Sequence, residues 1–295
     1  MENQNKVRAD LRQLKPFFIV AFVGIIYHLR IRPMAGDDVF FSQATSELGL
    51  WNYLIQRYET WTSRFVIEFL LVWIIKYPIL WRLIDLALFI SFPVLISKIF
   101  DGGKLLDWCA AAAVLLYPFH DMGTAGWITT TVNYFWPVWG MSFVGFLLKK
   151  MLVHKKINIV EGIAGVLVCV IASSHAQVAV ILFVVFILYG IYLICGKSKK
   201  MPLVQDSAGS TLTDKKVIHS NNLYLAGMVL VNIITLISIL FCPGNAGRNT
   251  VSIADLPIFE TYGFGDKLYL GLLSIERVFI ANCDAVFLTV ALVLA

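Results

Sequence analysis

The stretch PFFIVAFVGIIYHLRIRPMAGDDVFF, residues 16–41, contains the pattern around which the rest of the chain is organised. Residues 16–31 form an apolar segment, and the adjacent carboxylates Asp37 and Asp38 follow directly after it. Ionised side chains are costly in hydrocarbon and rarely gather at a membrane boundary without solvent, a partner or a function. Two interpretations follow: a solvated turn in which Gly36 supplies backbone freedom, or one corner of a functional site.

The composition excludes a soluble globular protein, because 59% of the 295 residues are hydrophobic and only 15% are charged. Several apolar runs approach or reach the length needed to cross a bilayer. The fold class that we predict is therefore all-α, a polytopic transmembrane helical bundle. The net charge of +5 does not indicate a nucleic-acid partner, because the basic residues lie in short clusters between apolar runs.

The basic clusters predict the orientation of the chain in the membrane. Basic residues precede residue 16 and no cleavable signal pattern is present, so we expect a cytoplasmic N-terminus and a multi-pass protein of the cytoplasmic (inner) membrane. Lysine clusters at 149–156 and 197–216 would both face the cytoplasm, with one outward and one return crossing between them. This places His175, at the turn of that hairpin, near the outer face.

Counting apolar runs by parity gives about eight spans within a single transmembrane domain, residues 1–295. Residues 36–77 would form an external loop with interfacial helices at 51–61 and 65–75, since the second of these is too short to cross and contains Glu68. We expect further loops at 196–221, flexible and cytoplasmic, and at 243–267, external. Residues 268–280 would lie at the surface before a last crossing from residue 285, and because the chain ends inside an apolar run we expect further C-terminal spans.

In this topology most of the unusual polar residues lie on the outer side of the membrane. They are Asp37, Asp38, Arg57, Arg64, Glu68, His120, Asp121, Asn133, His175, Asn245 and Arg248. Arginine suits phosphate because its planar group donates two parallel hydrogen bonds, and a carboxylate suits the activation of a hydroxyl. Each residue also has an ordinary explanation: arginines can snorkel from interfacial helices, and a histidine between two spans is often only a hairpin residue. The convergence on one face favours a site for a charged, partly sugary ligand.

Four short motifs resemble a known family. They are Gly36-Asp37-Asp38, Trp61-Thr62-Ser63-Arg64-Phe65, Asn133-Tyr134-Phe135-Trp136-Pro137 and Pro243-Gly244-Asn245-Ala246-Gly247-Arg248. In this order they resemble the bacterial DUF6056 family of polytopic membrane proteins, which is related to the O-antigen glucosyltransferase-like membrane proteins. The arrangement as a whole, an anchor followed by an acidic first outer loop and many spans, is similar to the GT-C superfamily of membrane glycosyltransferases.

The resemblance implies transfer of a sugar from a polyprenyl-phosphate donor to a glycan or lipid acceptor of the cell envelope, on the outer face of the membrane. It implies Asp37 as general base of an inverting displacement, with Asp38 orienting the acceptor. Arg64 and Arg248 would neutralise the phosphate leaving group, and the candidate substrate-binding residues are Arg57, Asn133, Tyr134, Trp136, His175 and Asn245. Metal-using relatives hold a divalent ion, for which Asp38 is the candidate here; no other cofactor is implied.

Two other functions compete with this interpretation. A transporter or flippase for a lipid-linked or anionic substrate would place charges near the bilayer midplane, and the candidates for buried charge are Glu68, Asp85 and Glu161. A non-catalytic membrane protein of an envelope-assembly complex is the second alternative.

Overall fold

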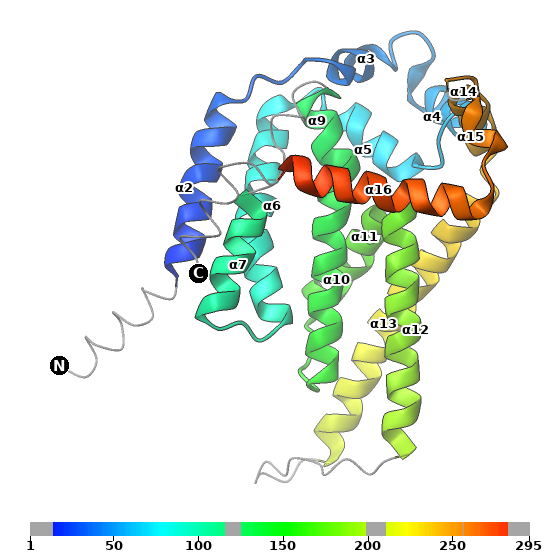
Figure 1. The fold of residues 1–295 in the computed structure, drawn as a ribbon. Coiled ribbons are helices and arrows are strands. Elements are labelled where there is room, and N and C mark those ends of the chain that lie inside the picture. Colours follow the sequence, from blue (N-terminus) through cyan, green and yellow to red (C-terminus); the bar gives the residue numbers. More distant parts are fainter. Residues whose placement is uncertain (1–13, 116–124, 199–210, 256, 283–295) are drawn as a thin grey trace. The chain divides into compact units, whose positions relative to one another are not determined.

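The computed structural model describes residues 14–115, 125–198, 211–255 and 257–282, which form helices and connecting turns (Figure 1). No strand occurs among these residues, so the all-α prediction is confirmed over the described part of the chain. The predicted site residues His120 and Asp121 and the last crossing from residue 285 lie outside it.

Three helices in the described part of the chain are long and apolar enough to cross a membrane. They are α6 (Pro78–Ile99), the segment Ala176–Cys195 of α12 (Ala176–Ser198) and the segment Ser220–Leu240 of α13 (Thr211–Leu240). These helices indicate a membrane protein. Shorter helices occupy other predicted crossings: α2 (Lys15–Arg30), α7 (Lys104–Leu115) and α11 (Ile159–Ser173). The count of about eight spans and their orientation stay predictions.

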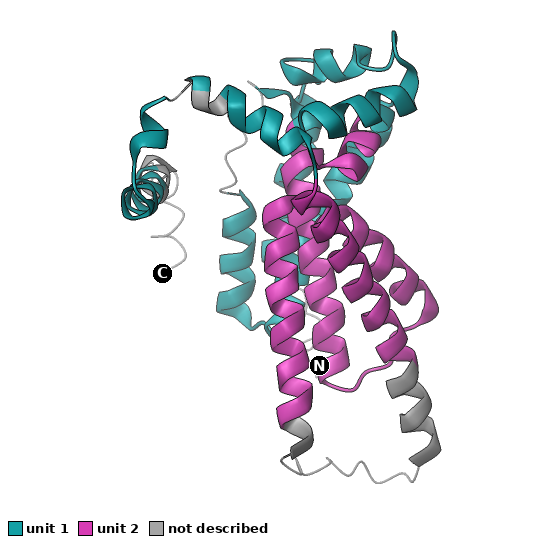
Figure 2. Cartoon of the chain, turned by 90° about the vertical axis from the view of Figure 1, so that its right-hand side faces the viewer, with its two compact units in different colours: residues 1–62, 72–129, 242–295 teal, residues 63–71, 130–241 magenta. Residues whose placement is uncertain are grey.

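The chain divides into two compact units that alternate along the sequence (Figure 2). Unit 1 contains residues 1–62, 72–129 and 242–295, and unit 2 contains residues 63–71 and 130–241. In unit 1, α2, α6 and α7 pack on one another, and α14 (Gly244–Asp255) packs on α4 (Gly49–Thr60). The prediction of a single domain is not tested by this division.

Unit 2 is a bundle in which α11 packs against α10 (Trp136–Leu152), α12 and α13. Figure 2 shows its long helices side by side. The buried centre is apolar, with Val144, Leu147, Cys169 and Met228 fully enclosed. Glycines allow close packing here, since a Cβ at Gly165 would lie 2.4 Å from the Leu147 side chain.

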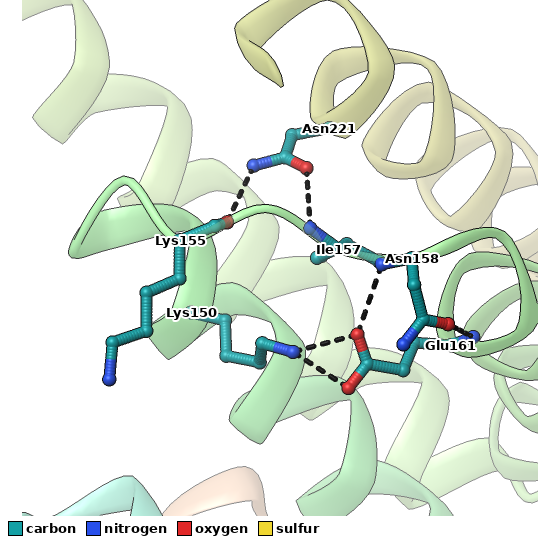
Figure 3. Close-up of polar contacts among 6 residues, drawn as sticks. All are labelled: Lys150, Lys155, Ile157, Asn158, Glu161 and Asn221. Carbon is teal, nitrogen blue, oxygen red and sulfur yellow. Dashed lines mark hydrogen bonds and ion pairs between the residues drawn. The ribbon is translucent and has the colours of Figure 1, made fainter. Parts of the chain in front are cut away.

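One end of the bundle is fixed by polar contacts around the turn between α10 and α11 (Figure 3). Lys150 Nζ donates to both carboxylate oxygens of Glu161 at 2.7 Å, and Glu161 also completes a reciprocal N-terminal cap with Asn158. Asn221 of α13 accepts from the Ile157 amide at 3.1 Å and donates to the Lys155 carbonyl at 3.0 Å. Glu161, considered above as a buried charge, is therefore a capping and ion-pairing residue.

Two predicted loops are shorter than expected. α12 continues to Ser198 and α13 already begins at Thr211, because residues 211–221 contain neither proline nor glycine to interrupt a helix. The predicted external loop 243–267 is largely helical, with α14, α15 (Ile258–Thr261) and the start of α16 (Phe264–Asn282). A Cβ at Gly244 would lie 2.5 Å from the Trp61 amide, so this glycine lets α14 approach the end of α4 closely.

The apolar segment predicted at 65–75 forms α5 (Phe65–Ile74), which has 10 residues. At about 1.5 Å per residue it is roughly half as long as the hydrocarbon core is thick, as the sequence predicted. Ile67, Glu68, Leu71, Val72 and Ile74 are buried within the protein, whereas Trp73 is exposed. α5 is thus covered mainly by protein, and its position relative to a membrane stays a prediction.

Candidate functional site

Asp38 is completely buried, and its carboxylate joins two parts of unit 1 that are distant in sequence. Its Oδ1 accepts from the Thr129 amide and the Thr129 hydroxyl, both at 2.8 Å. Its Oδ2 accepts from the amides of Met34 at 3.2 Å and Ile128 at 3.3 Å. Because Ile128 and Thr129 lie in the first turn of α9 (Trp127–Thr130), Asp38 caps this helix from another segment.

Only a glycine at position 126 lets the chain pass this close to Asp38. Gly126 has a positive φ of 98°, and a Cβ there would lie 2.7 Å from Asp38 Oδ1 and 2.8 Å from the Asp38 amide. The cap therefore depends on Gly126 as well as on Asp38. The sequence offered no signal that would connect these two positions.

The neighbouring Asp37 has the opposite environment. It is exposed at the first position of α3 (Asp37–Gln43), next to the anchored Asp38. The sequence left open whether this acidic pair forms a turn or part of a functional site. Asp38 has the structural role, and the exposed Asp37 is free to face a ligand. Of the two, only Asp37 is accessible enough to act as a general base.

The Asp38 carboxylate does not fit a divalent ion, because four hydrogen-bond donors already occupy its two oxygens. Among the described residues, no three His, Cys, Asp or Glu side chains gather into a group that could hold a metal ion.

In unit 1, Arg57 lies against aromatic rings, two of which belong to α3, the helix that begins at Asp37. The Arg57 guanidinium is 5.8 Å from the Phe40 ring centroid and 5.9 Å from those of Phe41 and Trp61. Arg248 and Asn245 are exposed on α14, which packs on the helix that carries Arg57.

The densest group of predicted site residues lies in unit 2, where Arg64, Asn133, Tyr134 and His175 come together. Arg64 Nη1 donates to Asn133 Oδ1 at 3.1 Å, and the Arg64 guanidinium lies 5.4 Å from the Tyr134 ring centroid. Tyr134 in turn meets the His175 ring edge to face, with centroids 5.5 Å apart. We call these four residues the arginine cluster. Trp136, a further candidate, is buried two residues beyond Tyr134.

His175 is the most unusual member of the arginine cluster. It is only 6% exposed, and neither ring nitrogen has a hydrogen-bond partner. Burial, together with the nearby positive charge of Arg64, lowers the pKa of His175 from its ordinary value near 6.5 to about 4. The imidazole is therefore neutral at pH 7 and offers one unused donor and one unused acceptor. Tyr134, which is 45% exposed, lies against it at the surface.

The arginine cluster is built on an irregular helix. Residues Thr131–Phe135 form a π-helical turn, η1, between α9 and α10. Pro137 has no amide hydrogen with which to bond the Asn133 carbonyl in an α-helix, and the Trp136 amide bonds instead to the Thr131 carbonyl. The Asn-Tyr-Phe-Trp-Pro motif thus contains the signal for this turn, because a proline inside an apolar helical run requires a local change in hydrogen bonding.

The predicted site residues are divided between the two units. Asp37, Asp38, Arg57, Asn245 and Arg248 belong to unit 1, whereas Arg64, Asn133, Tyr134, Trp136 and His175 belong to unit 2. The expectation that Asp37, Arg64 and Arg248 act on one substrate stays a prediction.

The comparisons with known proteins leave the family open. No family model matches the chain, and searches of curated proteins and of solved structures gave no match. The resemblance to the DUF6056 family and to GT-C enzymes thus stays a prediction.

Proposed function

We propose that the protein is a membrane glycosyltransferase of the GT-C type that transfers a sugar from a polyprenyl-phosphate donor to a lipid or glycan acceptor. The observation that carries the proposal is the arginine cluster. Its guanidinium is oriented by a buried amide and lies against an exposed tyrosine ring. Such an arginine suits a phosphate, and the ring beside it suits the apolar face of a sugar.

In the proposed reaction the acceptor hydroxyl attacks the anomeric carbon while the bond from this carbon to the phosphate oxygen breaks. Asp37 takes the proton of the hydroxyl, which requires hydrogen-bond reach in the substrate complex. Arg64, assisted by Arg248, neutralises the charge that develops on the leaving phosphate. His175 would meet the ligand as a neutral hydrogen-bonding group, because its lowered pKa keeps it uncharged beside Arg64.

The test is sugar transfer by the purified chain in vesicles supplied with polyprenyl-phosphate sugars and a crude lipid acceptor fraction. We expect Asp37→Asn to abolish transfer and leave donor binding intact, because the amide keeps the shape but cannot accept the proton. Arg64→Ala should weaken donor binding, and Glu47→Gln, at an exposed acid near the same part of the chain, should change neither. Full activity of Asp37→Asn would refute the proposed mechanism.

A second candidate function is transport of a lipid-linked or anionic substrate. The buried Asp85 within α6, one of the three span candidates, favours it, because ionisable residues inside membrane segments often mark transport pathways. Movement of a labelled polyprenyl phosphate across vesicles that contain no acceptor, lost in Asp85→Asn and kept in Asp37→Asn, would support transport instead of transfer.

A further inference from the structure

The contact between α2 and α6 contains a buried pair of ionisable side chains. The helices run antiparallel: Gly24 meets Phe89, His28 meets Asp85, and the Ile31 carbonyl accepts from Arg82 at 3.0 Å. Gly24 permits this approach, because a Cβ there would lie 2.8 Å from the Phe89 ring. His28 and Asp85 are 2% and 4% exposed.

The hydrogen bonds of His28 determine how many protons the pair holds. Its Nδ1 lies 2.7 Å from the Gly24 carbonyl, which can only accept, so Nδ1 carries a proton. Its Nε2 lies 3.0 Å from Asp85 Oδ2. A bond at this distance needs a second proton, located on Nε2 or on the carboxyl group. In both cases the pair is electrically neutral overall and shares one proton.

The surroundings of His28 make this shared proton important. The His28 ring is enclosed by the rings of Tyr27, Trp81 and Phe89, with centroids 6.0 to 6.3 Å away. Without the shared proton, a carboxylate would face the lone pair of a neutral imidazole. Two hydrogen-bond acceptors cannot bond to each other, so this contact between the helices would be lost.

The other titratable or charged residues of the packed helices are Lys15, Tyr27 and Arg30 on α2, Arg82 and Lys98 on α6, and Lys104, Asp107 and Cys109 on α7. Asp107 is buried but bonds to Ser97, near the other end of α6. Arg82 bonds to the end of α2, and Tyr27 places its ring edge against His28.

We propose that His28 and Asp85 form a buried proton-binding site, which holds one exchangeable proton and fixes the end of α2 from which the chain passes to Asp37. The chain between Ile31 and Asp38 is held at both ends, by Arg82 and this pair at one end and by the Asp38 cap at the other. Loss of the proton releases the first of these ends. The site is independent of the reaction proposed above.

The proton count can be measured directly on the full chain in nanodiscs, with ¹⁵N-labelled histidine and ¹³C-labelled aspartate. The His28 and Asp85 resonances are assigned by comparison with His28→Gln and Asp85→Asn. We expect either an imidazolium with a carboxylate or a neutral imidazole with a carboxylic acid at pH 7. A neutral imidazole beside an ionised Asp85 would refute the proposal without any need for a variant.

The coupling to α2 can be measured by amide hydrogen exchange, corrected for the intrinsic effect of pH. In the wild type we expect the Ile31 amide, which bonds to the Tyr27 carbonyl, to lose protection at the pH where NMR shows the shared proton leaving. Asp85→Asn should remove this loss, because its amide donates to Nε2 at every pH. Asp107→Asn, at a buried acid of the neighbouring helix α7, should retain it, and the Phe100 amide at the far end of α6 should not respond. Equal behaviour of Asp85→Asn and the wild type would overturn the proposal.

Discussion

At the scale of single residues, the burial of His175 makes the free energy of unfolding depend on pH. As the pH falls, the unfolded state binds the proton first, because the pKa of His175 in the folded protein is about 4 and the ordinary value is about 6.5. We therefore expect the free energy of unfolding to be constant above about pH 6.5 and to fall between there and pH 4 by at most about 3 kcal/mol. Unfolding in detergent across this range tests it. His175→Gln should remove the fall and His154→Gln, at an exposed histidine, should keep it.

The two adjacent acids allow a matched comparison. Asp38→Asn places an amide among four donors, so we expect a loss of about 3 kcal/mol in the free energy of unfolding. Asp37→Asn, at an exposed position, should change it by less than about 0.5 kcal/mol. Equal losses in the two variants would contradict the cap. The sequence could not distinguish these acids, because three of the four donors to Asp38 come from residues far along the chain.

At the scale of elements, Asn221 is the residue that joins α13 to the turn between α10 and α11. Asn221→Ala leaves the Ile157 amide without its partner, so we expect a loss of about 1–3 kcal/mol in the free energy of unfolding. Asn222→Ala is the control, because Asn222 is exposed on the same helix. A loss of the same size at residue 222 would mean that helix propensity, and not the contact, is responsible.

Apolar periodicity was sufficient to predict most elements, and proline and glycine account for those it missed. The helices α2, α6, α11 and α12 follow runs of apolar residues that the sequence displays directly. α14 could not be predicted in this way, because it is short, rather polar and held by backbone contacts that Gly244 and Gly247 permit. Apolar periodicity could not predict the π-helical turn either, because its cause is the single amide hydrogen that Pro137 lacks.

At the scale of the whole molecule, the orientation in the membrane is open to a direct test. Because Asp38 and His175 are buried, single cysteines belong at exposed positions near them: 37, 177 and 248 for the outer face and 155 for the cytoplasmic face. In a cysteine-free background we expect an impermeant thiol reagent to label the first three in intact cells and the last only after permeabilisation. Labelling of position 248 only after permeabilisation would overturn the predicted topology.

The candidate site could be predicted in part. The sequence singled out Arg64, Asn133, Tyr134 and His175, and these residues do contact one another within unit 2. It could not predict that His175 is left without hydrogen bonds, since that depends on how the surrounding helices close around the ring. The pairing of His28 with Asp85 was missed for the same reason: neither helix shows its partner in its own periodicity.

The cap at Asp38 also has a consequence for the order in which the molecule folds. Three of its four donors lie 90 or 91 positions further along the chain. During synthesis the carboxylate must remain hydrated until residues 128 and 129 have appeared, and closing so large a loop costs entropy before any contact forms. Contacts of such long range form late. Substitutions at Asp38 should therefore accelerate unfolding and leave the rate of folding almost unchanged.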